Sequence, residues 1–339
     1  MRRANLLAAL LASILGLPST SALALAQSRA TLQVNVFPGA ANLPLWIAQR
    51  EGFYAKRGLT VTISHPKGSV DQFEGLVAGR YPLVVTAFDN VIAYHSGQGA
   101  AQVGAVSDLI AVMGIDRGFL TLVAAPGITR IADLKGRTLA VDALSTGYTF
   151  ALSDILRRSG VERTDVSFIA VGNSEARWKA LEEERAQAAL LTLPSDLEAI
   201  DQGSAALTSV AGSFGHYLAN VVAVKETWAA SHAAELTAFL RGTRDATTWL
   251  FARPHRARAL AILHAQMPAL DERQLERVYE ALLDSQQGLL RSGVIDAEGA
   301  RTVLALRAQY AEVTPPLQEL DAVIDSRYLT GKSRPRTGH

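Results

Sequence analysis

The polar and apolar residues of the first third of the chain repeat the order strand, turn and helix. Apolar and polar residues alternate at 32–36 (LQVNV), and after a Pro-Gly turn the segment 43–48 (LPLWIA) indicates a helix. The same order follows at 59–79, where LTVTI precedes a helix, and starts again from residue 82. Strands that alternate with helices predict a mostly parallel sheet with helices on its faces.

A second unit of the same kind begins near residue 119, and a helical block follows it. Short apolar strands are expected at 119–125, 138–142, 166–171 and 187–193, each followed by a polar turn. From about residue 231 apolar residues recur every three or four positions, which predicts helices near 254–266, 271–285 and 296–312. Because such a block cannot easily form a sheet of its own, we expect it to pack on the first unit.

The first residues have the pattern of an export signal. Two arginines precede the apolar run 4–17, and Ala24-Leu25-Ala26 fits the small-residue cleavage rule. The run is shorter than the roughly 20 apolar residues that span a bilayer. It therefore predicts a cleaved signal peptide at 1–26, rather than a membrane anchor, and a mature chain that starts near Gln27.

Composition narrows the class of protein. The chain has no cysteine, which excludes disulfides, thiolate metal sites and the lipid attachment of a lipoprotein. Without Arg2 and Arg3, 31 basic residues face 32 acidic ones, so the mature net charge is −1. The charges are nearly balanced, and the only basic cluster is at 332–336. This argues against a protein that binds nucleic acid. The seven histidines show no metal-ligand spacing. We expect a soluble, periplasmic monomer that is not anchored to the membrane and has no cofactor or metal.

An ordered set of short segments carries a family resemblance. They are 44–48 (PLWIA), 51–53 (EGF), 58–61 (GLTV), 76–79 (LVAG), 133–137 (DLKGR), 139–141 (LAV) and 221–224 (VVAV) before a long helix. In this order and at these intervals, the chain resembles the periplasmic binding proteins for alkanesulfonates, nitrate and thiamine-pyrimidine precursors. That family also includes proteins similar to the pyrimidine synthase of fungal thiamine biosynthesis.

The resemblance implies a type II periplasmic binding protein fold, in which two α/β lobes are joined by two hinge crossings. We expect the crossings near 110–118 and 214–224. The implied boundaries are 27–112 and 222–330 for lobe 1, 113–221 for lobe 2 and 331–339 for a disordered tail.

Candidate ligand-binding residues follow from the expected sheets. In open α/β sheets ligands bind beyond the carboxyl ends of the strands, where loops lead into helix N-termini. From lobe 1 the candidates are Phe37, Asn42, Lys67, Ser69, Phe88, Asp89 and Asn90; from lobe 2 they are Ser145, Thr146, Tyr148, Asn173 and Pro194.

Several candidates have a structural alternative. Ser69 (in a capping-box pattern with Gln72), Thr146 and Asn173 suit helix caps, and aromatic residues at strand ends pack in cores as well as along clefts. Asp89 bears on the ligand class: as a cap it leaves the ligand open, but facing the cleft it favours an amine or ring N–H. Lys67 favours an anion instead.

The implied function is the substrate-binding component of an ABC-type importer, with the permease and its ATPase subunit as partners. The ligand is a small organic solute, which is a sulfonate, an aromatic acid or a pyrimidine-like compound, captured by hinge closure. No catalytic residue is assigned. The alternative is an enzyme of the pyrimidine-synthase-like type acting on a small heterocycle, for which His65 is the residue to consider as a base.

Overall fold

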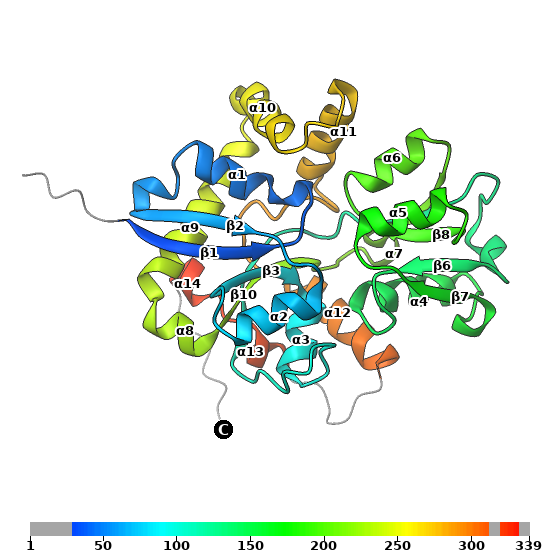
Figure 1. Ribbon diagram of the computed structural model, residues 1–339, viewed down its shortest axis with the longest axis horizontal. Coiled ribbons are helices and arrows are strands. Elements are labelled where there is room, and N and C mark those ends of the chain that lie inside the picture. The colour runs from blue at the N-terminus through cyan, green and yellow to red at the C-terminus, as the bar shows by residue number, and fades with distance from the viewer. Residues whose placement is uncertain (1–28, 312–318, 332–339) are drawn as a thin grey trace, which may run out of the picture.

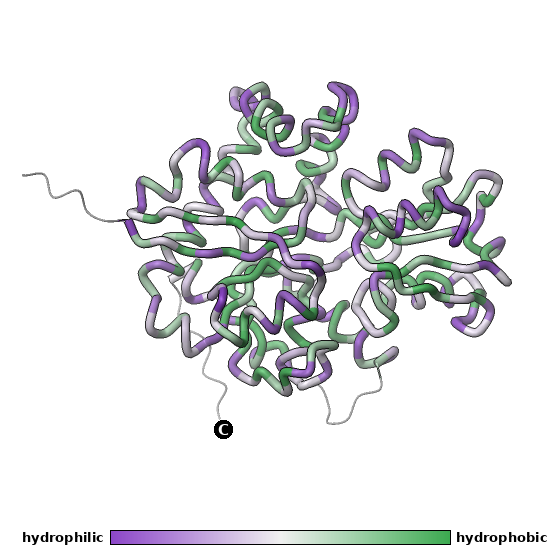
Figure 2. Tube along the Cα trace, viewed as in Figure 1, coloured by the Kyte–Doolittle hydropathy of each residue, from purple (hydrophilic) through white to green (hydrophobic). Residues whose placement is uncertain are grey.

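Two α/β lobes lie side by side in the computed structural model, which describes residues 29–311 and 319–331 (Figure 1). The expected signal peptide at 1–26 and residues 332–339 of the expected tail lie outside the described residues. No helix in the described ranges is long and apolar enough to cross a membrane. Apolar residues concentrate in the strands and in the helix faces that cover them (Figure 2).

Lobe 1 contains a five-stranded mixed sheet with the order β2-β1-β3-β10-β4. Four strands run in one direction, and β10 runs antiparallel to both of its neighbours. The strands are β1 (Ala30–Val36), β2 (Leu59–Ser64), β3 (Leu83–Ala87), β4 (Leu109–Gly114) and β10 (Asn220–Lys225).

Helices cover both faces of this sheet. Apolar residues of α1, α9, α10 and α11 form one buried cluster with one set of strand residues, and those of α2, α3 and α12 pack against the alternate set. The helices of this lobe are α1 (Leu43–Arg50), α2 (Ser69–Val77), α3 (Phe88–His95), α8 (Glu226–Ser231), α9 (Ala233–Leu250), α10 (Arg256–Gln266), α11 (Glu272–Leu283), α12 (Ala297–Tyr310), α13 (Leu320–Val323) and α14 (Arg327–Thr330).

Lobe 2 repeats the arrangement with the sheet order β7-β6-β8-β5-β9, in which β5 is the antiparallel strand. Helix α4 packs on one face, and α5 and α6 pack on the other. The elements are β5 (Thr121–Ala124), β6 (Thr138–Val141), α4 (Gly147–Arg158), β7 (Ser167–Ala170), α5 (Ser174–Glu182), β8 (Ala188–Leu191), α6 (Ser195–Asp201), β9 (Ala205–Ser209) and α7 (Val210–Phe214).

The path of the chain explains the one reversed strand in each sheet. The chain leaves lobe 1 after β4 and enters lobe 2 at β5; it returns from α7 to β10. Both crossings, 115–120 and 215–219, join the edges where the parallel strands end. A strand that enters a sheet from that edge must run against the others. The first crossing begins later than expected, because 109–114 forms a buried strand of the sheet.

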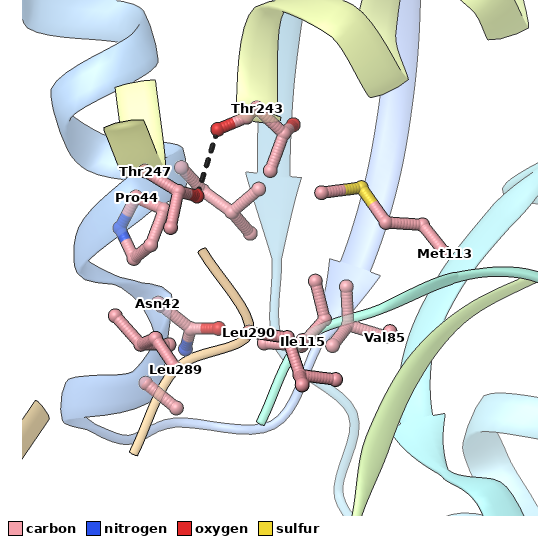
Figure 3. Close-up of a pocket in the computed structure, with 12 residues that line it drawn as sticks. Asn42, Pro44, Val85, Met113, Ile115, Thr243, Thr247, Leu289 and Leu290 are labelled. Carbon is pink, nitrogen blue, oxygen red and sulfur yellow. Dashed lines mark hydrogen bonds between the residues drawn. The ribbon is translucent and has the colours of Figure 1, made fainter. Parts of the chain in front are cut away.

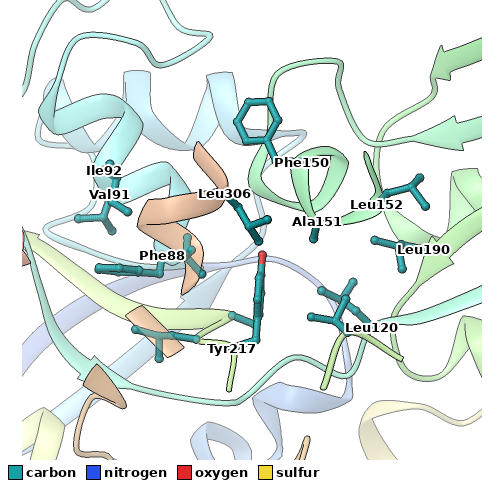
Figure 4. Close-up of a cluster of buried hydrophobic side chains, with 14 of the residues drawn as sticks. Phe88, Val91, Ile92, Leu120, Phe150, Ala151, Leu152, Leu190, Tyr217 and Leu306 are labelled. Carbon is teal, nitrogen blue, oxygen red and sulfur yellow. The ribbon is translucent and has the colours of Figure 1, made fainter. Parts of the chain in front are cut away.

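The expected fold class is confirmed, with one addition. The helical C-terminal block packs on lobe 1 as expected, but α12 contacts α4 of lobe 2 as well as α3 of lobe 1. A single buried cluster therefore runs from Phe88 and Val91 in α3 through Leu306 in α12 to Phe150 in α4 (Figure 4).

Candidate functional site

The carboxyl ends of the parallel strands of both sheets face the crossings, so this is where the residues of a shared site meet. Asp116 of the first crossing is fully buried, and its carboxylate accepts hydrogen bonds from the Asn220 side-chain amide (2.9 Å) and the Gly118 backbone N–H (3.0 Å). Burial raises the pKa of Asp116 to about 6, although both hydrogen bonds act in the opposite direction. The Asp116 carboxylate thus links the first crossing to the start of β10, and the Asp116 backbone carbonyl accepts from the Ala219 N–H of the second crossing at 3.1 Å.

A polar cavity opens in lobe 2 beside these crossings. Asp142, at the end of β6, and Tyr148, Thr149 and Arg177 line it together with apolar residues of β6, β8 and α4. Burial raises the pKa of Tyr148, and the nearby charge of Asp116 adds to the effect. The cavity therefore borders both lobe 2 and the crossings.

Arg177 is the least compensated charge of the site. It is 3% exposed, one terminal nitrogen donates to the Gly172 carbonyl at 3.0 Å, and its Nε has no hydrogen-bond partner among the described residues. Burial lowers the pKa of Arg177, while the charge of Asp142 opposes that change. A buried guanidinium with free donors can hold an oxygen acceptor of a ligand.

A buried ion pair connects the lobes next to this cavity. Arg307 of α12 binds the Asp89 carboxylate through Nε (2.6 Å) and Nη2 (2.7 Å), and the Gly147 backbone N–H of α4 donates to the same carboxylate at 2.7 Å. Asp89 belongs to lobe 1 and Gly147 to lobe 2. The carboxylate thus occupies the N-terminus of α4, a position that suits an anion.

The expected candidates in lobe 1 have varied surroundings. Phe88 is fully buried in the core, so its placement as a wall of the cleft is wrong. Asp89 does not cap its own helix, because its carboxylate is engaged by Arg307 and Gly147. The capping-box expectation for Ser69 is also wrong, since α2 begins after Gly68 without a side-chain cap. Gln72 instead points inward and donates to the Asn35 and Val85 carbonyls and the Asn35 side-chain oxygen.

The other lobe 1 candidates make local contacts. The Asn42 amide donates to the Phe37 carbonyl (2.7 Å), the Asn90 amide donates to the Thr86 hydroxyl (3.0 Å), and Lys67 is exposed. These contacts do not test whether Phe37, Asn42, Lys67 and Asn90 bind a ligand, so those assignments stay predictions.

The lobe 2 candidates include two confirmed helix caps. Thr146 accepts from the Thr149 N–H, and Asn173 accepts from the Ala176 N–H. Ser145 is exposed, and its carbonyl accepts from Arg307 at 3.4 Å. Tyr148 lines the polar cavity, and Pro194 precedes α6. Ligand binding by Ser145, Thr146, Tyr148, Asn173 and Pro194 remains a prediction.

A second cavity lies inside lobe 1, between α1, α9 and the sheet (Figure 3). Its lining is mostly apolar, including Val85, Met113 and Leu289, and the Thr247 hydroxyl that borders it donates to the Thr243 carbonyl at 2.9 Å. At about 10 Å³ it has room for about one water molecule. The polar cavity of lobe 2 is equally small, so the difference between the two lies in their linings. We assign the mostly apolar lobe 1 cavity to imperfect core packing rather than to ligand binding.

Sequence reasoning missed several residues of the site. Asp142 directly follows the carboxyl end of β6, so the rule used for the other candidates would have found it. Asn220 starts the antiparallel strand β10 and falls outside that rule. Arg177 and Arg307 lie inside helices α5 and α12. An arginine in a helix is ordinarily solvent-exposed, so no local signal distinguishes these two. No group of three or more potential metal-ligating side chains occurs in the part of the chain that the structure describes.

The two lobes and the two crossings between them define the fold of the periplasmic binding proteins. A family model described as NMT1/THI5 like matches residues 40–257, and the chain belongs to this family. No curated protein matches it in sequence.

Several solved structures share the fold. The alkanesulfonate-binding protein SsuA from Xanthomonas axonopodis pv. citri, bound to MOPS, is 17% identical with a TM-score of 0.70 (87% of this chain, 99% of that one). The periplasmic nitrate-binding protein NrtA from Synechocystis PCC 6803 is 12% identical with a TM-score of 0.70 (88% and 86%). The desulfurization enzyme DSZB is 16% identical with a TM-score of 0.60 (89% and 98%).

Proposed function

We propose that this chain is the solute-binding component of an ABC-type importer and that it binds a small organic molecule between its lobes without changing it. The observation that carries the proposal is the polar site at the crossings. Asp116 contributes to it from the first crossing, Asn220 from the start of β10, and Tyr148 and Arg177 from lobe 2. Small-molecule sites combine an enclosed space with a few convergent polar groups. The similarity in fold to SsuA and NrtA supports the same reading.

Hinge closure is the mechanism that this arrangement favours. The crossings 115–120 and 215–219 are short, so rotation about them changes the separation of the lobes. A ligand that contacts both lobes shifts the population toward the closed form. The permease with its ATPase subunit then recognises the closed form, and the periplasm is the compartment in which we place the protein.

The alternative is an enzyme, and the fold similarity to DSZB is the observation that favours it. The residue considered as a base, His65, is exposed, and its Nδ1 lies 2.8 Å from the Val36 carbonyl oxygen. His65 therefore makes a local contact with the end of β1. We favour binding without turnover.

Two measurements on the purified protein test the proposal. Native mass spectrometry identifies any small molecule that is retained, and solution scattering with that molecule, or with hits from a thermal-shift screen, reports closure. Binding should raise the melting temperature by mass action and lower the radius of gyration, and the compound should be recovered unchanged. Conversion of the compound would support the enzyme instead, and binding without compaction would contradict hinge closure.

A further inference from the structure

Each crossing contains one glycine in the left-handed region, and each of these glycines adjoins a charged or titratable side chain. Gly118 of the first crossing has a φ of 95° and follows Arg117, whereas Gly215 of the second has a φ of 73° and precedes His216. The His216 N–H donates to the Phe214 carbonyl at 2.9 Å, so Gly215 is the centre of a γ-turn of the rare, strained type. Domain rotation is absorbed by a few such residues, which places the hinge of the second crossing at Gly215.

The side chain of His216 is held by the first turn of α12. Its Nδ1 lies 3.1 Å from Asp296 Oδ2, and its Nε2 lies 3.1 Å from Glu298 Oε2. Arg117 of the first crossing lies 3.6 Å from the same Asp296 oxygen. A Cβ on Gly299 of α12 would lie 2.7 Å from backbone atoms of the second crossing, so the helix and the crossing are in direct contact. The start of α12 is therefore joined to both crossings.

Only the protonated form of His216 satisfies both of these contacts. A neutral imidazole has one N–H and one lone pair, so it donates to one carboxylate and turns a lone pair toward the other. The imidazolium donates to both and places a positive charge between two negative ones. Although burial acts in the opposite direction, the hydrogen bond from His216 lowers the pKa of Asp296, so that carboxylate stays charged over the range in which histidine titrates.

The other charges around His216 do not offset its protonation. Arg158 of α4 bonds the end of α7, but it is paired with Asp154. Asp116 of the first crossing is buried and accepts its own hydrogen bonds. Protonation therefore changes the cluster from one cation, Arg117, facing two carboxylates to two cations facing two carboxylates. Because the His216 side chain is 53% exposed, it exchanges its proton with the solvent.

The conformation that accompanies this cluster has the lobes in contact. The Gly147 N–H of lobe 2 donates to Asp89 of lobe 1 at 2.7 Å beside α12. Arg277 of α11 pairs with Asp201 of α6, at the upper side of the crossings in Figure 1. Separation of the lobes requires rotation at the crossings, and a His216 ring fixed to α12 opposes that rotation next to Gly215.

We infer that His216 is a proton-controlled latch of the hinge. When protonated, it ties the second crossing to Asp296 and Glu298 and stabilises the contact between the lobes; when deprotonated, it loses one of these bonds and the lobes separate more readily. The inference rests on the hinge motion of the proposed function, but it concerns the protein without ligand. It can therefore be tested separately from ligand binding.

Labels on the two lobes measure the expected effect. Because the chain has no cysteine, the exposed positions Ala269→Cys, before α11, and Lys179→Cys, in α5, place one fluorophore on each lobe. Single-molecule energy transfer then reports the separation of the lobes at about pH 5.5 and about pH 8. Raising the pH should lower the population with the lobes in contact about two- to fivefold, the range expected for a partly exposed ion pair. An equal population at both pH values would overturn the inference.

Variants of the latch assign the effect to its residues. His216→Gln should remove the pH dependence and keep the population at its high-pH value, and Glu298→Gln should reduce the dependence. His264→Gln is the control, because this exposed histidine of α10 forms no ion pair in the described ranges, and it should leave the pH dependence unchanged. Circular dichroism verifies that each variant is folded. A pH dependence that persists in His216→Gln would belong to another group, such as Asp116, and would overturn the inference.

The same labels distinguish failure of the latch from failure of the proposed function. A separation that changes when a retained or screened solute is added, but not with pH, would overturn the latch and leave solute binding by hinge closure supported. A separation that changes with neither would count against both.

Discussion

The buried pair of Asp89 and Arg307 gives the most direct test of how the lobes are held together. Each side chain is 3% exposed, and the Asp89 carboxylate accepts from two guanidinium nitrogens and from the Gly147 N–H. In Arg307→Met, the carboxylate keeps one donor and no counter-charge. Removal of one partner of a buried pair costs about 3–5 kcal/mol in the free energy of unfolding.

The expected loss is large enough to measure by urea denaturation and differential scanning calorimetry. With a shift of roughly 2–4 °C per kcal/mol for chains of 150–250 residues, the melting temperature should fall by about 6 °C or more. Because the carboxylate also reaches the N-terminus of α4, the variant should have a larger radius of gyration in solution scattering. Arg80→Met, which removes a partner of the exposed Asp71 pair, is the control and should cost less than about 1 kcal/mol.

The double variant Asp89→Leu with Arg307→Met tests whether the two charges are buried away from water or are close together but hydrated. If the desolvation of two charges offsets their attraction, the double variant should be about as stable as the unsubstituted protein. A loss below about 1 kcal/mol for Arg307→Met alone would show that the pair is hydrated in solution. The described contact between the lobes would then not be the dominant conformation.

Three further predictions follow from single groups. Burial raises the pKa of Asp116 to about 6, so the folded state binds a proton that the unfolded state has already released between about pH 4 and 6, and stability falls as pH rises through that window. Asp116→Asn should remove up to about 1.4 kcal/mol per pH unit of this slope, as urea titrations at pH 4–7 would show; an unchanged slope would mean that Asp116 is solvated. Gly147→Ala should destabilise the protein by about 1–3 kcal/mol, because a Cβ would lie 2.4 Å from the Asp89 Cβ, whereas Gly68→Ala meets no atom within 4 Å; equal effects in thermal melts would refute the close approach of α4 to Asp89. Arg277→Ala removes a partly exposed ion pair with Asp201 between α11 and α6, so its cost should stay below about 1 kcal/mol and vanish in 1 M salt; a larger, salt-independent loss would contradict a screened surface pair.

Local patterns in the sequence were sufficient for most elements of the fold. Most strands could be predicted because alternating or short apolar runs are a local property of the sequence. The caps at Thr146 and Asn173 could be predicted because a cap bonds a backbone N–H only three residues away. Strand β4 (LIAVMG) was missed because it is buried on both faces and so lacks alternation. Strand β9 was missed because it is short and only partly buried.

The candidate site was predictable only in outline. The rule that ligands bind at the carboxyl ends of strands places loops near the crossings, but it does not decide which side chains point inward. Phe88 follows a strand and nevertheless belongs to the core, whereas Arg177 lies in a helix and nevertheless lines the cavity. The surroundings of these two side chains depend on how α3 and α5 pack against the rest of the protein. The sequence of a short segment does not specify that packing.

The sequence by itself thus determined that the chain alternates strands and helices in two units, carries a signal-like N-terminus and resembles one family. The tertiary structure decided the meaning of Asp89. Sequence alone left it as a cap or a cleft residue, but its partner Arg307 is 218 positions away and its other partner, Gly147, lies in the opposite lobe. Propensities and caps act over a few residues, while a buried charge is compensated by whatever the packing of distant helices brings beside it.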